Sequence, residues 1–389
     1  MTQAAPASAG PPLGIYIHWP YCARICPYCD FNVYRDRGRR QEQAALVQAI
    51  VDDLHAQAAL TGPRTLVSVF FGGGTPSLMD PAAVAQVLAA AQSLWTPAQD
   101  LEVSLEANPT DAEAERFSAL AQAGIGRLSL GVQALDDAAL AFLGRDHDAA
   151  AARRALAMAA RTFPRLSLDL IYARPGQTPG AWAAELAEAL ESGAEHMSPY
   201  QLTIEAGTAF DRAVRRGRFS PPDEAVGAAL YETTQAVLEA AGFEAYEVSN
   251  HARGLAARSR HNLVYWQGVD YVGVGPGAHG RITLGGVRQA TEALARPADY
   301  IARVAESGWG FPELEALSPI SAAEERVLSG LRVWPGVTFA EVAPLGLSPE
   351  HPRVQALVDA GLLQKDNFRL RSTPAGRLLL DHVTRQLLV

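Results

Sequence analysis

The sequence predicts an α/β protein made of a partial, TIM-like (β/α)6 barrel followed by a winged-helix-like α+β module. Short β-branched runs alternate with helix-length amphipathic stretches along residues 13–250, a pattern typical of repeated βα units and a parallel sheet. About six such units are too many and too regular for a small sandwich. After residue 280 the alternation stops, and helices followed by a hairpin replace it.

The expected elements follow in chain order. Strands are expected at 13–18, 65–71, 101–109, 126–133, 165–178 with its turn, and 196–205, with 243–250 as a further candidate. Helices are expected at 39–60, 81–94, 111–123, 180–192 and 223–241. Further helices are expected between the strand at 126–133 and about residue 161. The tail is expected to hold helices at 321–332, 338–343, 351–361 and 374–387, with a hairpin at 362–371. The expected domains are a flexible N-terminus (1–12), the barrel (13–285), a connecting segment (286–317) and the C-terminal module (318–389).

Composition excludes several classes of protein. The chain has 389 residues, 48% of them hydrophobic, which is ample for a buried core. A net charge of −9 argues against nucleic-acid binding, and the candidate recognition helix at 351–361 carries only one Arg beside an Asp. We therefore expect the tail to pack or to dock a partner rather than to bind DNA. No apolar run is long enough to span a membrane, and the first residues lack a signal-peptide pattern, so a cytoplasmic location is expected.

The only three cysteines, Cys22, Cys26 and Cys29, lie within eight residues directly after the first expected strand. Their number is odd, and disulfides are rare in the cytosol, so metal chemistry is the expected use. Three thiolates can hold three irons of a [4Fe–4S] cluster and leave the fourth iron open to a chelating ligand. A three-cysteine zinc site is the alternative, but structural zinc usually has a fourth Cys or His nearby.

Polar residues gather at the ends of the expected strands. The segment Gly72–Pro76 ends one strand, and Glu106, Gln133 and Asp169 lie near the ends of three others. Each alone could be a loop or capping residue. In a barrel, however, the C-terminal ends of the strands carry the functional site, so the group predicts a site on that face.

The segment YIHWPYCARICPYCDFN (16–32) resembles the signature loop of the radical S-adenosylmethionine (SAM) superfamily. More narrowly, the chain from Gly14 through its C-terminal module resembles the oxygen-independent coproporphyrinogen III oxidase-like branch. The resemblance implies a radical-SAM barrel that binds a [4Fe–4S] cluster and SAM. It also implies a one-electron donor, such as a flavodoxin or ferredoxin.

The resemblance further implies a set of SAM-binding residues. Tyr28 matches an aromatic residue near the adenine, the glycine-rich strand end matches the contact to the SAM amino group, and Glu106 matches the carboxylate that binds the ribose. The implied set is Tyr16, Tyr28, Gly73, Gly74, Thr75, Glu106, Gln133, Arg145 and Asp169. The chain departs from the family at Ala173, where a glycine is usual.

The branch contains both decarboxylating oxidases and haem chaperones. Oxidases carry a fourth Cys two positions after the third, where this chain has Phe31, and an N-terminal extension that is absent here. The segment 261–266, HNLVYW, resembles the HNxxYW motif of the chaperones and implies haem contacts from His261, Tyr265 and Trp266. The alternative is that His261 caps a loop and Trp266 fills the core. We expect a haem chaperone that delivers haem to acceptor haemoproteins such as respiratory enzymes, with a coproporphyrinogen III oxidase as the rival and a DNA-binding regulator as a third class.

Overall fold

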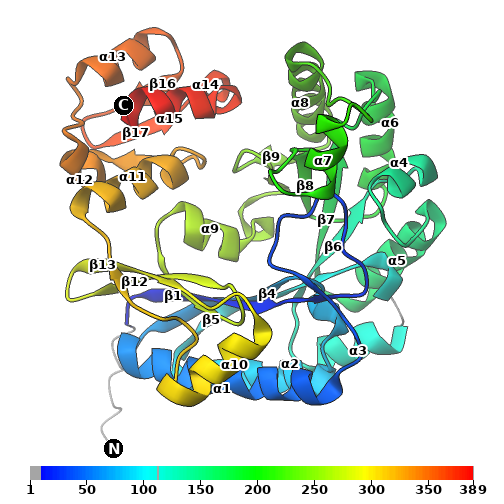
Figure 1. Ribbon diagram of the computed structural model, residues 1–389. Coiled ribbons are helices and arrows are strands. Elements are labelled where there is room, and N and C mark those ends of the chain that lie inside the picture. Colours follow the sequence, from blue (N-terminus) through cyan, green and yellow to red (C-terminus); the bar gives the residue numbers. More distant parts are fainter. Residues whose placement is uncertain (1–9, 112–113, 389) are drawn as a thin grey trace, which may run out of the picture.

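The computed structural model describes residues 10–111 and 114–388, and its main feature is an open barrel formed by a mixed sheet (Figure 1). The sheet has twelve strands in the order β14-β13-β12-β11-β1-β4-β5-β6-β7-β8-β10-β9. The strands from β11 to β8 in this order run parallel. They are β11 (Asp270–Val274), β1 (Pro12–Trp19), β4 (Thr65–Gly73), β5 (Thr96–Ala107), β6 (Arg127–Gln133), β7 (Arg165–Tyr172) and β8 (His196–Gln201).

Helices between the strands cover the outer face of the sheet, as Figure 1 shows for α1 and α2 beneath β4 and β5. Several begin where a polar side chain accepts a backbone N–H at the N-cap, as Asp80 and Asp223 do, which satisfies an amide that the helix cannot. The helices of this part are α1 (Arg40–Thr61), α2 (Pro81–Leu94), α3 (Ala114–Gln122), α4 (Asp137–Phe142), α5 (Ala149–Thr162), α6 (Pro179–Leu190), α7 (Ala209–Arg215) and α8 (Glu224–Ala240). Short 3-10 turns lie at Pro76–Leu78, Pro109–Asp111, Leu255–Ala257 and Ala343–Leu345.

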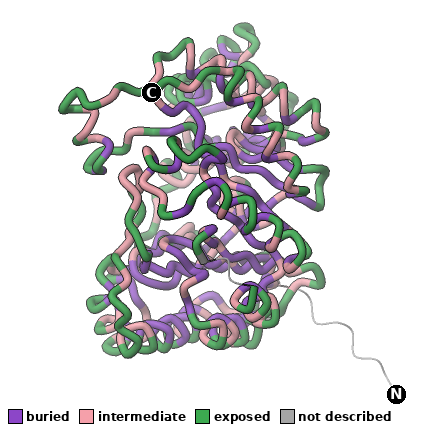
Figure 2. The backbone as a smooth tube through the Cα atoms, turned by 90° about the vertical axis from the view of Figure 1, so that its right-hand side faces the viewer, coloured by how far each residue is buried: buried purple, intermediate pink, exposed green. Residues whose placement is uncertain are grey.

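The two faces of the barrel strands differ in chemistry. Apolar residues such as Leu105 and Leu168 are fully buried and belong to the main hydrophobic core, which follows the sheet and its helices (Figure 2). The alternate positions are polar, and each strand from β4 to β8 contributes one buried serine to them. These serines are Ser68, Ser104, Ser129, Ser167 and Ser198. The barrel interior is therefore lined largely by polar side chains, with serines among them, instead of the bulky branched residues usual in such barrels.

The structure places the late strands differently from the expectation. Residues 243–250 form no full strand: β9 (Glu244–Ala245) and β10 (His251–Ala252) are short and antiparallel. The seventh parallel position is taken by β11, which pairs with β1. The segment 286–317, expected as a connection, holds β13 (Val287–Glu292), α10 (Pro297–Ser307) and β14 (Glu315–Ala316), and its strands extend the barrel sheet beyond β12 (His279–Leu284).

The C-terminal module has its own core, which includes Val327, Phe339 and Leu370. A three-stranded antiparallel sheet in the order β15-β17-β16 packs with its helices, as expected for a winged-helix-like module. Its elements are α11 (Pro319–Gly330), β15 (Val337–Thr338), α12 (Phe339–Val342), α13 (Pro352–Asp359), β16 (Leu363–Lys365), β17 (Arg369–Ser372), α14 (Pro374–Leu378) and α15 (Leu380–Leu388). Within the described residues, no helix combines the length and apolar character that crossing a membrane requires.

Candidate functional site

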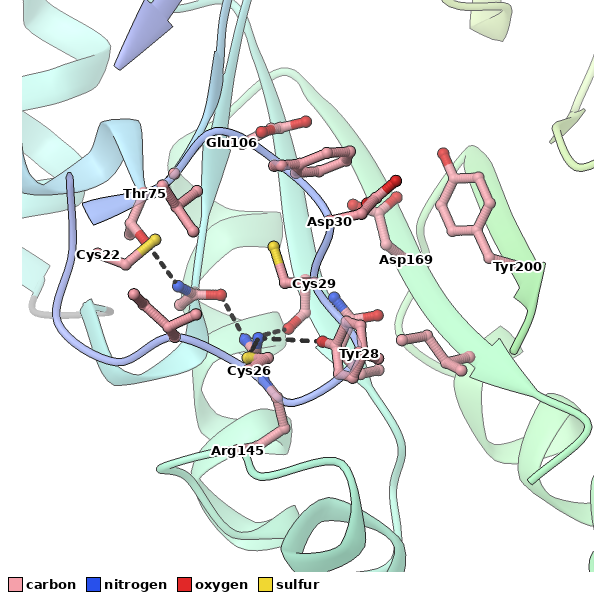
Figure 3. A pocket seen from close by; sticks show the side chains of 18 of the residues that line it. Cys22, Cys26, Tyr28, Cys29, Asp30, Thr75, Glu106, Arg145, Asp169 and Tyr200 are labelled. Carbon is pink, nitrogen blue, oxygen red and sulfur yellow. Dashed lines mark hydrogen bonds between the residues drawn. The ribbon is translucent and has the colours of Figure 1, made fainter. Parts of the chain in front are cut away.

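The three cysteines line a pocket of about 380 Å³ at the C-terminal ends of the barrel strands (Figure 3). Cys22 lies in β2 (Tyr21–Cys22), which pairs with β3 (Tyr34–Arg35), and the other two lie in the loop between these strands. All three thiols are free of disulfides. The β2–β3 pairing closes the loop, so β2 and the loop together present all three thiols to one cavity.

The thiols fit a cluster better than a single metal ion. Within the described residues, no three His, Cys, Asp or Glu side chains gather as they would around one ion. A [4Fe–4S] cluster does not require such convergence, because each thiolate binds a different iron. Burial raises the pKa of Cys29 to about 11, so its proton must leave when a metal binds. The guanidinium of Arg145 lies 3.3 Å from the Cys26 sulfur.

Hydrogen bonds hold the cysteine loop against the barrel. His18 Nε2 lies 2.9 Å from the carbonyl oxygen of Asn32, at the far end of the loop. The Asn32 amide donates to the carbonyls of Pro276 and Ala295 at 2.8 Å each. The glycine-rich segment 273–280 therefore closes over the end of the loop.

The glycines that follow β4 are required by close backbone approaches. Gly73 has a φ of +107°, and a Cβ atom there would lie 2.5 Å from the His18 ring. At Gly74 a Cβ atom would lie 2.7 Å from the Tyr21 carbonyl oxygen. Thr75 follows and accepts a hydrogen bond from the Asn108 amide at 3.0 Å. This backbone can come close to a ligand in the pocket.

Two half-buried carboxyl groups face the same cavity. Glu106 accepts a hydrogen bond from the Gly73 amide at 3.1 Å, and burial, aided by the charge of Asp169, raises its pKa to about 8. Burial also raises the pKa of Asp169, which accepts from the Ser129 hydroxyl at 3.0 Å. In their protonated forms both groups can donate as well as accept hydrogen bonds, which suits a ligand rich in hydroxyls.

Arg145 joins the cysteine loop to the strand ends. It donates to the Tyr28 hydroxyl at 3.4 Å, to the Gly131 carbonyl at 3.1 Å and to the Asn108 side-chain oxygen. Asn108 was missed by the sequence argument, although it follows Glu106 by two residues and so faces the same side of β5. Gln133 ends β6 with a φ of +67° and lines the pocket.

Eight of the nine expected SAM residues line this pocket, and Tyr16 does not. Tyr16 lines an inner chamber of about 300 Å³ deeper in the barrel, where its hydroxyl lies 3.0 Å from His18 Nδ1. The chamber adjoins the pocket, since both are lined by Phe31, Gly73, Glu106, Ser129, Asp169 and Tyr200.

The three expected haem residues come from one helix, α9 (Arg260–Trp266), but they do not share one cavity. His261 and Tyr265 line the inner chamber. Trp266 instead lines a groove of about 750 Å³ between the barrel and the C-terminal module, where the guanidinium of Arg332 lies 4.5 Å from its ring centre. Tyr265 borders both cavities.

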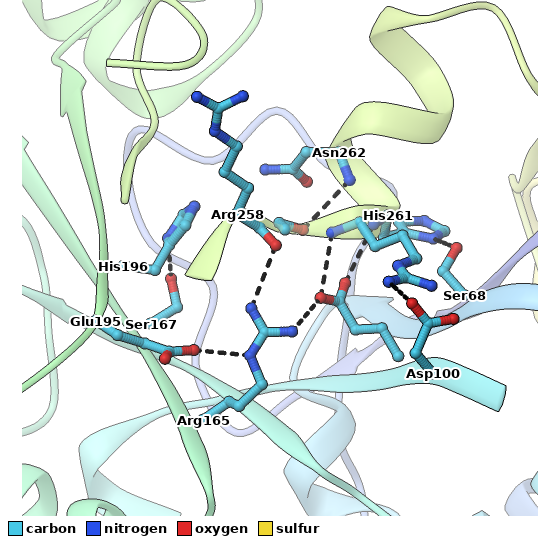
Figure 4. Close-up of polar contacts among 12 residues, drawn as sticks. Ser68, Asp100, Arg165, Ser167, Glu195, His196, Arg258, His261 and Asn262 are labelled. Atoms are coloured by element: carbon cyan, nitrogen blue, oxygen red, sulfur yellow. Dashed lines mark hydrogen bonds and ion pairs between the residues drawn. The ribbon is translucent and has the colours of Figure 1, made fainter. Parts of the chain in front are cut away.

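Both ring nitrogens of His261 have hydrogen-bond partners, and Figure 4 shows the contact with Ser68. Its Nδ1 lies 3.0 Å from the Ser68 hydroxyl and its Nε2 lies 2.7 Å from the Tyr265 hydroxyl. Burial lowers its pKa to about 3, so the ring is neutral at physiological pH. Glu102 fixes the start of α9 by accepting the backbone N–H groups of Arg260 and His261 at 3.1 Å each.

The raised pKa of Glu106 predicts a pH effect on the metal-free protein. The folded protein keeps Glu106 protonated up to about pH 8, whereas the unfolded chain releases this proton near pH 4.5. The carboxyl therefore stabilises the fold fully below pH 4.5, and this contribution is lost as the pH rises to about 8. The slope from one group is at most about 1.4 kcal/mol per pH unit. Glu106→Gln should therefore gain stability relative to the wild type as the pH rises through this window. Denaturant unfolding of both proteins at several pH values measures it; parallel pH profiles would contradict the assignment.

An open parallel barrel with three cysteines after its first strand, and with glycines and acids at the following strand ends, is the arrangement of a radical SAM protein. Residues 16–189 match the family model of the radical SAM superfamily, and residues 317–379 match that of the HemN C-terminal domain. The chain belongs to the radical SAM superfamily, and the predicted fold class is confirmed.

Three known proteins illustrate the relationship. The chain is 42% identical to radical S-adenosyl methionine domain-containing protein 1, mitochondrial, of Bos taurus, over 99% of this chain and 89% of that protein. It is 38% identical to the heme chaperone HemW of Mycobacterium tuberculosis strain H37Rv, over 97% of this chain and 95% of that protein. The solved structure of coproporphyrinogen III oxidase (HemN) from Escherichia coli matches with a TM-score of 0.80 at 21% identity, over 97% of this chain and 90% of that chain, and shares the fold.

Proposed function

We propose that this chain is a cytoplasmic haem chaperone, which binds haem and delivers it to acceptor haemoproteins such as respiratory enzymes. The observation that carries the proposal is the near full-length similarity to a heme chaperone HemW at 38% identity. The HNLVYW segment and the absence of a thiol at Phe31 support the same function over decarboxylation.

The cluster and SAM belong to the scaffold in this proposal. Cys22, Cys26 and Cys29 would hold a [4Fe–4S] cluster, and the strand-end residues around Glu106 would hold SAM. When bound, these groups supply one-electron chemistry from a donor such as a flavodoxin or ferredoxin. The protein contributes the close glycine backbone, the two half-buried acids and the Arg145 guanidinium beside Cys26.

Haem would approach along the α9 face. A neutral imidazole is the form that ligates haem iron, and burial keeps His261 neutral. Both ring nitrogens are engaged, so one hydrogen bond must open first. Tyr265 is the partner that can yield, because it lies between the inner chamber and the Trp266 groove. Haem would then replace the Tyr265 hydroxyl at Nε2.

The test compares haem and porphyrinogen chemistry on one preparation. Anaerobically reconstituted protein is given haem in one assay, and SAM, a reductant and coproporphyrinogen III in another. We expect stoichiometric haem binding, transfer to an apo-haemoprotein and no protoporphyrinogen. His261→Ala should shift the Soret band and slow transfer, whereas His382→Ala, an exposed histidine on α15, should change neither. Protoporphyrinogen formed at catalytic turnover, or an absence of haem binding, would overturn the proposal.

A further inference from the structure

The inner chamber borders three inward positions of the barrel wall where the side chains are small. Ser129, Ser167 and Ser198 line it on three consecutive strands. Bulky branched residues at these positions would fill the interior of such a barrel. The serines leave a polar space of about 300 Å³ below the cysteine pocket.

Arg127 also lines this chamber, and two of its side-chain nitrogens lack hydrogen-bond partners. Its side chain belongs to β6, and the residue is 2% exposed. Within the part of the chain that the structure describes, its Nε and Nη2 atoms have no hydrogen-bond partner. Buried donors without acceptors are costly, and more so when the group is charged.

The two unpartnered nitrogens form one edge of the guanidinium, which is the edge that matches a carboxylate. The same edge is used elsewhere in this protein. Arg281 presents its Nε and Nη2 to Glu325 Oε1 at 2.8 and 2.7 Å. Arg127 therefore has the donor pair that binds carboxylates but has no carboxylate on it.

The acids around Arg127 are already engaged. Burial opposes ionisation of Glu102, but the charge of Arg127 helps to lower its pKa. The Glu102 oxygens already accept from Arg165 at 2.8 Å and from two backbone amides of α9. Glu106 accepts from Gly73 and Asp169 from Ser129. His196 and His261 on the chamber wall are neutral, because burial lowers the pKa of each. None of these groups accepts a hydrogen bond from Nε or Nη2 of Arg127, so an added carboxylate would satisfy this edge.

We propose that Arg127 binds a carboxylate group that enters the inner chamber. The volume is at the lower end for ligand sites, so the chamber fits a small acid or the acidic arm of a larger molecule, not a whole tetrapyrrole. Two sources share this chemistry: a propionate side chain of haem, or a small free carboxylate. The haem form rests on the proposed haem-binding function.

The first experiment removes the carboxylates from the ligand. Full-length, cluster-reconstituted protein is titrated with haem and with haem dimethyl ester. The wild type should bind haem about tenfold more tightly than the ester. Arg127→Gln should bring the two affinities within about twofold of each other, and Arg127→Lys should keep part of the preference because it keeps the charge but not the fork.

Arg260→Gln is the matched control. Arg260 forms a partly exposed ion pair with Asp100 and does not line the chamber, so this change should leave the preference for haem intact. A fold check by thermal unfolding accompanies each variant. If Arg127→Gln does not fold, the proposal is tested by the preference of the wild type for haem over its ester and by the smaller preference expected of Arg127→Lys.

The second experiment titrates the protein with propionate in the absence of haem and measures binding by calorimetry. Propionate binding that is lost in Arg127→Gln would assign the chamber to a free acid, and a preference for haem over its ester without propionate binding would assign it to the haem arm. Equal affinities for haem and its ester, with no propionate binding, would overturn the proposal. If haem does not bind at all, the proposed function fails, whereas the propionate titration still decides whether Arg127 binds a carboxylate.

Discussion

Serine in place of any one of Cys22, Cys26 or Cys29 is expected to leave almost no [4Fe–4S] cluster after anaerobic reconstitution. The chain has no other cysteine that could replace a lost ligand. An alcohol stays protonated at neutral pH, whereas iron clusters are held by thiolates. Two thiolates would then have to retain a cluster beside an open pocket. Iron and acid-labile sulfide per chain, together with the visible absorption spectrum, measure the occupancy.

Ala23→Ser is the control for this series. Ala23 is exposed and adjoins Cys22, so the variant adds a hydroxyl to the same loop without removing a thiol. It should keep the wild-type cluster content. A full-occupancy [4Fe–4S] cluster in any of the three Cys→Ser variants would show that the cysteine in question is not a ligand.

The sequence predicted the repeated βα units well because their period is local. The runs that begin at Thr65 and Arg165 each contain their own strand pattern, and each of these strands is followed by a covering helix. β11 was missed because only five residues form it and a glycine-rich turn follows. Its pairing with β1 joins segments far apart in the chain, which no local pattern records.

The site was predictable to the extent that strand ends define it. Glycines and acids at the ends of β4, β5 and β7 meet in one pocket because parallel strands end on one side of the barrel. Tyr16 lies deeper, since it precedes His18 by two residues and pairs with Phe70, below the strand end. The partner of His261 could not be foreseen, because Ser68 lies on a distant strand.

The polar inner face of the barrel was visible in the sequence as a period of two. Serine alternates with apolar residues in RLSLGVQ and RLSLDLIY, and Arg127 and Arg165 begin these runs. Alternation of this kind indicates a strand with one apolar and one polar face. In a barrel whose outer face is covered by helices, the polar face must point inward, which is where the chamber lies.

Gly73→Ala and Glu106→Ala are each expected to weaken SAM binding strongly. A methyl group at Gly73 would lie 2.5 Å from the His18 ring, so the backbone beside the pocket must move or SAM must lose its close contact. Loss of the Glu106 carboxyl leaves polar groups of the ligand unpaired at a cost of about 1–3 kcal/mol, which is roughly a fivefold to hundredfold change in affinity. Calorimetry on cluster-loaded protein measures both.

Gly176→Ala separates backbone strain from steric exclusion. Gly176 also has a positive φ, of +76°, but no atom lies within 4 Å of the position of its Cβ. This variant should lose stability through the unfavourable φ alone, without the clash that Gly73→Ala adds, and should bind SAM as the wild type does. For Glu106, the isosteric Gln should retain more affinity than Ala, because its amide still meets a hydroxyl. Unchanged SAM affinity in both Gly73→Ala and Glu106→Ala, with the fold intact, would place SAM elsewhere than at the strand ends of this barrel.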